Sequence, residues 1–161
     1  MQVLIAVDEP GTASELTSYV CSQSWKPGTE FAILHVVQEV LIGTYVSVLP
    51  SSLIAEMSKE AISVGEEMVR DAALRLRDKF HSPKVKEVVL TGIPGALIAE
   101  YARENQSELI IMSSKKRGLE RMLLGSVSGY VVAHSPCNVF VYCPPKSVPN
   151  RAARAAASAG V

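Results

Sequence analysis

Five short apolar runs, separated by segments with helical spacing, are the feature that most constrains how this chain can fold. Each run is continuous rather than alternating, which is typical of strands buried on both faces of a parallel sheet. Parallel neighbours need long crossover connections, and helices supply them. The sequence therefore predicts an α/β fold of order βαβαβαβαβ, a doubly wound, five-stranded parallel sheet with helices on both faces. The expected strands are residues 2–7, 29–37, 85–90, 109–112 and 138–143.

The longest helical pattern starts at Ser51 or Ser52 and breaks at residues 81–83. Its apolar residues are spaced by threes and fours and its charged residues fill other positions, which indicates an amphipathic helix of about seven turns. We expect its apolar stripe to form part of the core. The stripe consists of Leu53, Ile54, Met57, Ala61, Val64, Met68, Ala72 and Leu76.

Three shorter helices are expected in the other connections. Thr12 or Ser14 can cap the first of them. Pro94 suits the first turn of the next, because the N–H that proline lacks has no partner there. The last helix starts at Ser126 and ends near His134.

Length and composition limit the class of protein. At 161 residues the chain is long enough for one domain with a core and too short for two ordinary ones. Sixteen basic and sixteen acidic side chains balance, so charge favours neither nucleic acid nor an acidic membrane as a partner. No membrane-length apolar run or signal-peptide pattern is present, which predicts a cytoplasmic location. The three cysteines, Cys21, Cys137 and Cys143, lack metal-ligand spacing, so no metal site is expected.

Two segments fall outside the regular pattern. Residues 38–52 are long and more apolar than a solvent loop should be. They either pack on the protein's own sheet edge or serve as a lid or subunit interface. Residues 146–161 are rich in alanine and lack bulky apolar anchors, so we expect a mobile tail after a domain of residues 1–145.

A strand that leads through a basic turn to a helix start is the main candidate for a binding site. It spans residues 109–128 and reaches the helix at Gly125 and Ser126. N–H groups at a helix N-terminus have no intrahelical partner, and the helix dipole favours negative charge, so this geometry can bind an anion. Residues 115–117 add three cations in the turn, although such a charge run can also be simply solvated.

Four segments of the chain resemble the universal stress protein family, over residues 1 to about 143. They are VLIAVDE, FAILHVV, TGIPGALIAEYARENQSELIIM and GLERMLLGSVSGYVVAHSPCNVFVYC, and the last is the most specific. The resemblance implies a flavodoxin-like or Rossmann-like sheet with strand order 3-2-1-4-5. It also implies a homodimer through the fifth strand, with Val139 and Val141 facing across the paired strands.

Some members of the family bind adenine nucleotides, and these resemble a pattern of Gly, two residues, Gly, nine residues, then Gly followed by Ser or Thr. Here the final pair is Gly125 and Ser126, whereas the earlier glycine positions hold Met112 and Lys115. Alignment by the strand instead puts Ser113 in place of the first glycine. Two glycines are missing either way. Because a Cβ restricts positive φ and close approach to a phosphate, this departure argues against tight wrapping of a triphosphate.

The resemblance implies a site for ATP or AMP, with Mg²⁺ as an optional companion. Asp8 would accept hydrogen bonds from the ligand, or it would hold the turn that follows it. Val36 and Met112 would lie against the adenine ring. The implied site residues are Ala6, Asp8, Val36, Met112, Ser113, Lys115, Gly125, Ser126, Val127 and Ser128.

Two functions stay open at this point. One is a dimeric stress-response protein that binds an adenine nucleotide as a signal or switch. The other is a dimeric scaffold that binds a protein partner through residues 38–52 and the fifth strand, without nucleotide. An enzyme is not expected, because the sequence shows no Ser/His/Asp or Cys/His grouping and no GxxxxGK[ST] loop.

Overall fold

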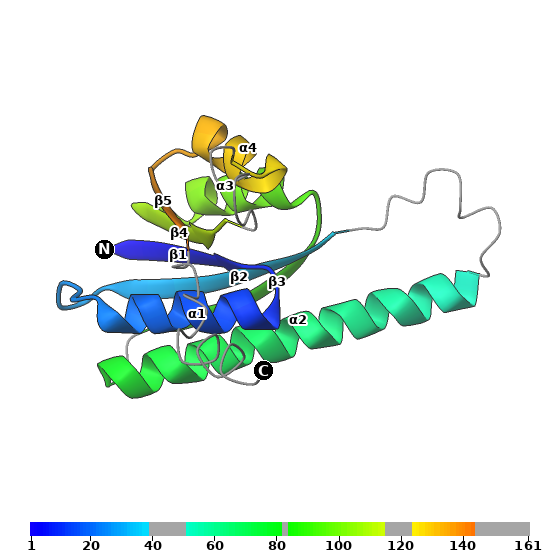
Figure 1. Ribbon diagram of the computed structural model, residues 1–161, viewed down its shortest axis with the longest axis horizontal. Helices are drawn as coiled ribbons and strands as arrows, with labels where there is room; N and C mark the ends of the chain where they lie inside the picture. Colours follow the sequence, from blue (N-terminus) through cyan, green and yellow to red (C-terminus); the bar gives the residue numbers. More distant parts are fainter. Residues whose placement is uncertain (39–50, 82–83, 115–123, 144–161) are drawn as a thin grey trace, which may run out of the picture.

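The computed structural model describes residues 1–38, 51–81, 84–114 and 124–143. In these ranges the strands are β1 (Gln2–Val7), β2 (Glu30–Gln38), β3 (Val85–Gly92), β4 (Leu109–Ser113) and β5 (Asn138–Tyr142). The helices are α1 (Pro10–Ser22), α2 (Ser51–Phe80), α3 (Pro94–Glu104) and α4 (Ser126–His134). All neighbouring strands pair in parallel in the order β3-β2-β1-β4-β5, which confirms the predicted fold (Figure 1).

Helices cover both faces of the sheet, α1 and α2 on one side and α3 and α4 on the other (Figure 1). Successive side chains of a strand point to opposite faces. Ile5 of β1 therefore packs with Leu16 of α1 and Leu76 of α2, whereas its neighbour Leu4 packs with Ile98 of α3. Burial on both faces explains why the strands are continuous apolar runs rather than alternating ones.

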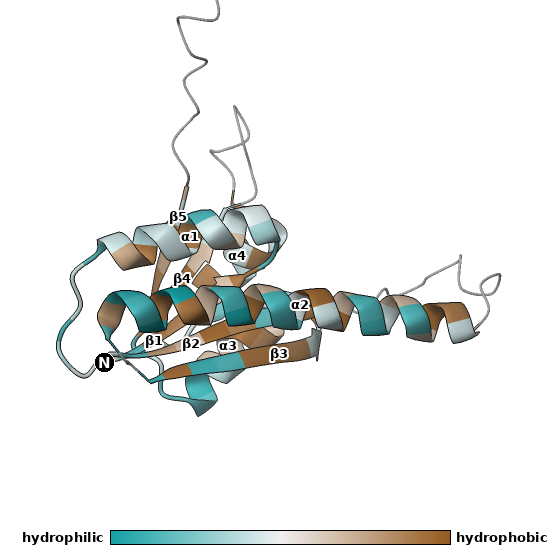
Figure 2. Ribbon diagram, turned by 90° about the horizontal axis from the view of Figure 1, so that it is seen from below, coloured by the Kyte–Doolittle hydropathy of each residue, from teal (hydrophilic) through white to brown (hydrophobic). Residues whose placement is uncertain are grey.

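Helix α2 begins at Ser51 and ends at Phe80, as predicted, but only part of its apolar stripe lies in the core. The buried members are Met68, Ala72 and Leu76. Four others are exposed, namely Ala61, Leu53 (40%), Met57 (50%) and Val64 (47%). A helix of 30 residues is about 45 Å long, whereas the longest strand, of nine residues, spans about 30 Å. The helix therefore runs past the sheet, and the prediction of a buried stripe is wrong for its N-terminal half (Figures 1 and 2).

The point at which α2 meets the sheet is Gly65, which is buried. A Cβ added at Gly65 would lie 2.6 Å from Cδ2 of His35 in β2. The His35 ring is held in turn, with its Nδ1 atom 3.0 Å from the carbonyl oxygen of Val7. Glycine is thus required for the close approach of helix and strand, a role that the sequence alone did not indicate.

Helix α1 begins at Pro10, so the prediction of a cap at Thr12 or Ser14 is wrong. Glu9 occupies the N-cap position in extended backbone and makes no side-chain capping hydrogen bond. Proline is well suited to the first helical position, because its φ is already helical and its missing N–H would have no partner. Pro10 and Gly11 are therefore the first two residues of α1 and do not form a separate turn before the helix.

The remaining boundaries agree with the predictions to within two residues. Helix α3 begins at Pro94, and α4 runs from Ser126 to His134. None of the helices in the described ranges is long and apolar enough to cross a membrane. The predictions for residues 39–50 and 146–161 concern segments outside the described residues.

Candidate functional site

Three of the predicted site residues come together under the carboxyl end of the sheet. Ala6 of β1 is the register partner of Met112 in β4, and Val36 lies near the end of β2. All three belong to one buried cluster on the face covered by α3 and α4. Their exposed fractions are 6% for Ala6, 9% for Val36 and 5% for Met112. They can therefore form the apolar floor of a site but little of its walls.

The N-terminus of α4 lies on the same face, because Val131 of α4 belongs to that buried cluster. Gly125 is its N-cap, and no described side chain caps the helix there. The first intrahelical bond runs from the N–H of Gly129 to the Gly125 carbonyl, at 2.7 Å. The N–H groups of Ser126, Val127 and Ser128 precede that bond, so they have no acceptor within the helix. This arrangement can receive an anion.

The two serines of this turn differ in what their hydroxyl groups do. Ser126 is exposed, whereas Ser128 is buried. The Ser128 hydroxyl donates to the carbonyl oxygen of Gly125 at 3.2 Å. It therefore stabilises the first turn of α4, and only Ser126 presents its side chain on the surface.

Gly125 has an ordinary extended conformation, with φ −64° and ψ 165°. A Cβ added there would lie 3.5 Å from the Ser128 Oγ, a normal van der Waals contact. Neither backbone strain nor crowding by the described residues requires glycine at this position.

Asp8 lies at the carboxyl end of β1, and its carboxylate contacts the start of α1. Its Oδ1 atom accepts hydrogen bonds from the N–H of Glu9, at 2.9 Å, and from the hydroxyl of Thr12, at 2.5 Å. This is the turn-holding role, one of the two alternatives that the sequence left open. Asp8 therefore fixes the loop that borders the site.

The chain leaves β4 through Ser113 and Ser114, and the structure adds Ser114 to the residues near the site. Ser114 is buried, and its N–H donates to the carbonyl oxygen of Tyr142 in β5 at 2.9 Å. The sequence analysis did not select it, although its position directly after Ser113 was a usable signal. Lys115 and the rest of the basic turn lie outside the described residues.

Other chemistry-bearing features lie away from this edge. A cavity of about 330 Å³ opens between α1 and α2, on the opposite face, with Ala13, Met68 and Leu74 in its lining.

Burial raises the pKa of the Cys21 thiol, while Arg75 and Lys79 lower it to a smaller extent. This thiol is therefore less ionised than an exposed one at neutral pH. Within the described ranges, no cluster of three His, Cys, Asp or Glu residues could hold a metal ion.

Comparison with known proteins identifies the family. A family model described as the universal stress protein family matches residues 1–142. The chain belongs to the universal stress protein family. Universal stress protein YxiE of Bacillus subtilis is 26% identical over 145 residues, which cover 87% of this chain and 97% of YxiE.

Other curated members of the family match over a shorter stretch. Universal stress protein MJ0531 of Methanocaldococcus jannaschii is 32% identical over 99 residues, or 61% of this chain and 53% of that protein. Slr1101 of Synechocystis is 42% identical over 53 residues, or 32% of this chain and 49% of that protein. The matched part thus spans about half the length of these two relatives.

Several solved structures share the fold. UspA from Lactobacillus plantarum has a TM-score of 0.72 at 22% identity, covering 88% of this chain and 96% of its own. Hypothetical protein MJ0577 has a TM-score of 0.75 at 25% identity, covering 91% and 97%. Three universal stress proteins at 16–17% identity were solved with dAMP (Archaeoglobus fulgidus), with cAMP, and with AMP (Arabidopsis thaliana).

Proposed function

We propose that this universal stress protein binds an adenine nucleotide at the carboxyl edge of its sheet, with the phosphate on the N-terminus of α4. The observation that carries the proposal is the α4 N-terminus itself. It has Gly125 as its N-cap, is uncapped by any described side chain, and lies on the same face as the apolar floor of Ala6, Val36 and Met112.

The phosphate is the group that the α4 N-terminus suits best. The N–H groups of Ser126, Val127 and Ser128 point out of the helix, where its dipole is equivalent to about half a positive charge. A hydrogen bond from such a donor to a charged acceptor contributes about 1.5–3 kcal/mol. Two or three of them supply a large part of a micromolar affinity, which corresponds to about 8 kcal/mol. The exposed hydroxyl of Ser126 adds a further donor.

The base would rest on the apolar floor. Ala6 is small, which leaves room above it, and Met112 offers a flexible, polarisable thioether to an aromatic ring. Val36 extends the same surface on β2. The proteins of this fold solved with dAMP, cAMP and AMP support an adenine base with a single phosphate.

A monophosphate also agrees with the sequence, because two of the glycines expected for a triphosphate loop are replaced. Binding of ATP, with or without Mg²⁺, stays a prediction. The proposal includes no catalytic step, since the described site residues supply donors and an apolar surface rather than a positioned base.

Calorimetric titration of the purified protein with AMP, cAMP and ATP tests the function, with GMP as the control for the base. We expect AMP to bind with a dissociation constant well below 1 mM and GMP to bind at least tenfold more weakly. Absence of heat for every adenine nucleotide up to millimolar concentration would favour the alternative of a nucleotide-free scaffold.

A second candidate property is a homodimer through β5, and the direction of its backbone groups favours it. Strand β5 is an edge of the sheet. The Tyr142 carbonyl faces β4, because it accepts the N–H of Ser114. Backbone groups alternate in direction along a strand, so those of Val139 and Val141 point outward from the edge. An unpaired edge of this kind is a template for a second strand.

The side chains of Val139 and Val141 do not face across the edge, which corrects the sequence-based expectation. They pack against the buried cluster beneath α3 and α4. The reason is the geometry of a strand. Its side chains point to the two faces of the sheet, and only its backbone N–H and C=O groups point sideways, toward a neighbouring strand. A dimer through β5 would therefore be held by main-chain hydrogen bonds of these two residues.

Replacing Val141 with proline is expected to convert a β5-paired dimer to a monomer. Proline removes the outward N–H but leaves the bonds between β5 and β4, so an edge position tolerates it. Val141→Ala keeps the N–H and serves as the matched control, which we expect to stay dimeric. Light scattering coupled to size exclusion gives the mass of each variant. A dimer that survives Val141→Pro would refute this interface.

A further inference from the structure

One buried hydroxyl at the carboxyl edge of the sheet has no partner among the described residues. Ser114, directly after β4, is only 7% exposed, and its side chain forms no hydrogen bond within the described ranges. Three other buried hydroxyls, those of Thr17, Thr29 and Ser128, each donate to a carbonyl oxygen at 2.7–3.2 Å. A hydroxyl that loses water on folding and gains no protein partner costs free energy, so its presence needs a reason.

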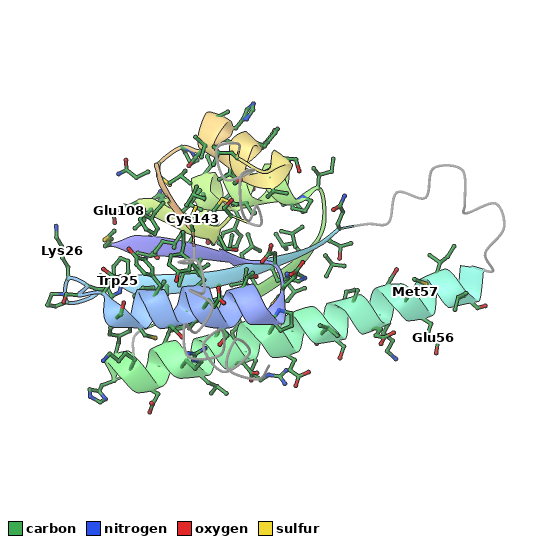
Figure 3. All side chains as sticks on the ribbon, in the orientation of Figure 1. Trp25, Lys26, Glu56, Met57, Glu108 and Cys143 are labelled. Atoms are coloured by element: carbon green, nitrogen blue, oxygen red, sulfur yellow. The ribbon has the colours of Figure 1, made fainter. Side chains whose placement is uncertain are left out.

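Ser107 is a second buried serine of this kind, and its position accounts for it. Its exposed fraction is 9%, and its hydroxyl also lacks a partner among the described residues. It precedes β4 at the amino edge of the sheet, where Figure 3 labels the next residue, Glu108. It lines a surface hollow there together with Ser135 and Asn138. Water in that hollow can supply the hydrogen bond of Ser107.

Strand geometry directs the Ser114 side chain to the face that carries α4. The Ser114 N–H donates to the Tyr142 carbonyl at 2.9 Å, so the regular ladder between β4 and β5 continues to this residue. Side chains alternate along a strand. Ile110 and Met112 pack in the cluster beneath α3 and α4. Ser114 therefore points to that same face, about 6.6 Å beyond Met112 toward the carboxyl edge.

The N-terminus of α4 lies over the same part of the sheet. Residues 135–137 alone separate α4 from β5, so the helix runs back along the strand that it contacts. Its nine residues span about 13.5 Å and the five residues of β5 about 16.5 Å, so the helix begins close to the carboxyl end of the strand. That end is Tyr142, the residue bonded to Ser114. The Ser114 hydroxyl and the N–H groups of residues 126–128 therefore converge.

We propose that the Ser114 hydroxyl binds the phosphate, donating a hydrogen bond to the same anion that the α4 N-terminus receives. The inference rests on the proposed function and extends it, because the phosphate is then held from two sides, by the helix and by the end of β4. A phosphate offers several acceptor oxygens, and a hydroxyl without a partner donates to one of them without breaking another hydrogen bond. Binding thus satisfies a group that is unsatisfied in the free protein.

Replacing Ser114 with alanine is expected to weaken AMP binding at least tenfold, because it removes a donor to a charged acceptor and keeps the backbone. Ser107→Ala is the matched control. It removes an equally buried, unpartnered hydroxyl at the other end of β4, and AMP affinity should stay within about twofold of the wild type. Calorimetric titration gives both affinities. The affinities for 2′-deoxy-AMP and 3′-deoxy-AMP should fall by the same factor as that for AMP, since both nucleotides keep the phosphate.

The stability of the nucleotide-free protein separates a binding role of Ser114 from a structural one. Because the hydroxyl has no protein partner, the melting temperature of Ser114→Ala should equal or exceed that of the wild type. Loss of a buried hydrogen bond would instead lower the melting temperature by about 2–4 °C. A fall of that size would show that the hydroxyl supports the fold and would overturn the proposal.

Inorganic phosphate separates this inference from the proposed function. We expect phosphate at about 50 mM to raise the melting temperature of the wild type above its value in chloride of the same ionic strength, because a ligand of the folded state stabilises it. The rise should be at most half as large in Ser114→Ala. If phosphate gives this result while AMP does not bind, the phosphate contact stands and the nucleotide function is wrong.

Three further results would overturn the inference. Equal AMP affinity of the wild type and Ser114→Ala would leave the nucleotide function intact and remove the hydroxyl from the site. An effect of Ser114→Ala that disappears with either deoxynucleotide would assign the hydroxyl to the sugar. A wild type that responds to neither phosphate nor AMP would exclude the phosphate contact together with the proposed function.

Discussion

Replacing Ser126 with proline is expected to weaken AMP binding at least tenfold without disturbing the fold. Ser126 is the first residue of α4, a position where proline is favoured because its N–H has no intrahelical partner. The preceding residue, Gly125, already has the extended φ and ψ that a residue before proline requires. The substitution therefore deletes the backbone N–H donor, together with the Ser126 hydroxyl, from the helix N-terminus and leaves the helix in place.

The size of the effect follows from the charge of the phosphate. Loss of one hydrogen bond to a charged group costs about 1.5–3 kcal/mol, or roughly 10- to 100-fold in affinity. Ser126→Ala is the matched control, because it removes the hydroxyl and keeps the N–H, and we expect a smaller loss. Calorimetry gives both affinities, and circular dichroism checks the fold. Unchanged AMP affinity in a folded Ser126→Pro protein would show that the phosphate does not use this helix.

Replacing Leu76 with alanine is expected to lower the free energy of unfolding by about 2–5 kcal/mol. Leu76 is fully buried, at 0% exposure, among residues of β1, β2 and α1. A truncated side chain there leaves a cavity that the packed sheet and helix cannot close. Since a domain of this size is stable by about 5–15 kcal/mol in total, the loss is a large fraction.

Leu74 provides the control for that prediction on the same helix. It lies two residues earlier and is 55% exposed, so Leu74→Ala should change the free energy of unfolding by no more than about 0.5 kcal/mol. Urea unfolding gives both values. The two variants are measured at the same protein concentration, because the apparent stability of a dimer depends on concentration. Equal midpoints for the two variants would contradict the assignment of Leu76 to the core.

The fold was predictable because all five strands have the same sequence pattern, a continuous apolar run. Each continuous apolar run could be explained by burial on both faces, and the five runs in alternation with helices left few topologies. The limits of α2 were also predictable, yet its environment was not. Met57 and Met68 lie in the same periodic stripe, but one is half exposed and the other buried. Periodicity records which face of a helix is apolar and not whether anything covers it.

The candidate site was predictable in outline and not in its contacts. The resemblance to the family assigned Ala6, Val36 and Met112 to one site, and the structure places all three in one buried cluster. The sequence left two roles open for Asp8, and the structure shows the hydrogen bonds of the turn-holding role, to Glu9 and Thr12. The predicted orientation of the Val139 and Val141 side chains was wrong, because side chains and backbone groups of an edge strand point in different directions. The assignment of Lys115 to the nucleotide site stays a prediction, because Lys115 lies outside the described residues.

The most direct test of a nucleotide on the α4 N-terminus is a titration of the isotope-labelled protein with AMP, followed through its backbone amide resonances. We predict that the largest shifts occur at the amides of Ser126, Val127 and Ser128, because a phosphate would accept their hydrogen bonds. Saturation should reproduce the calorimetric affinity. Shifts confined to residues of the cavity between α1 and α2, or no shifts at several millimolar AMP, would contradict the account.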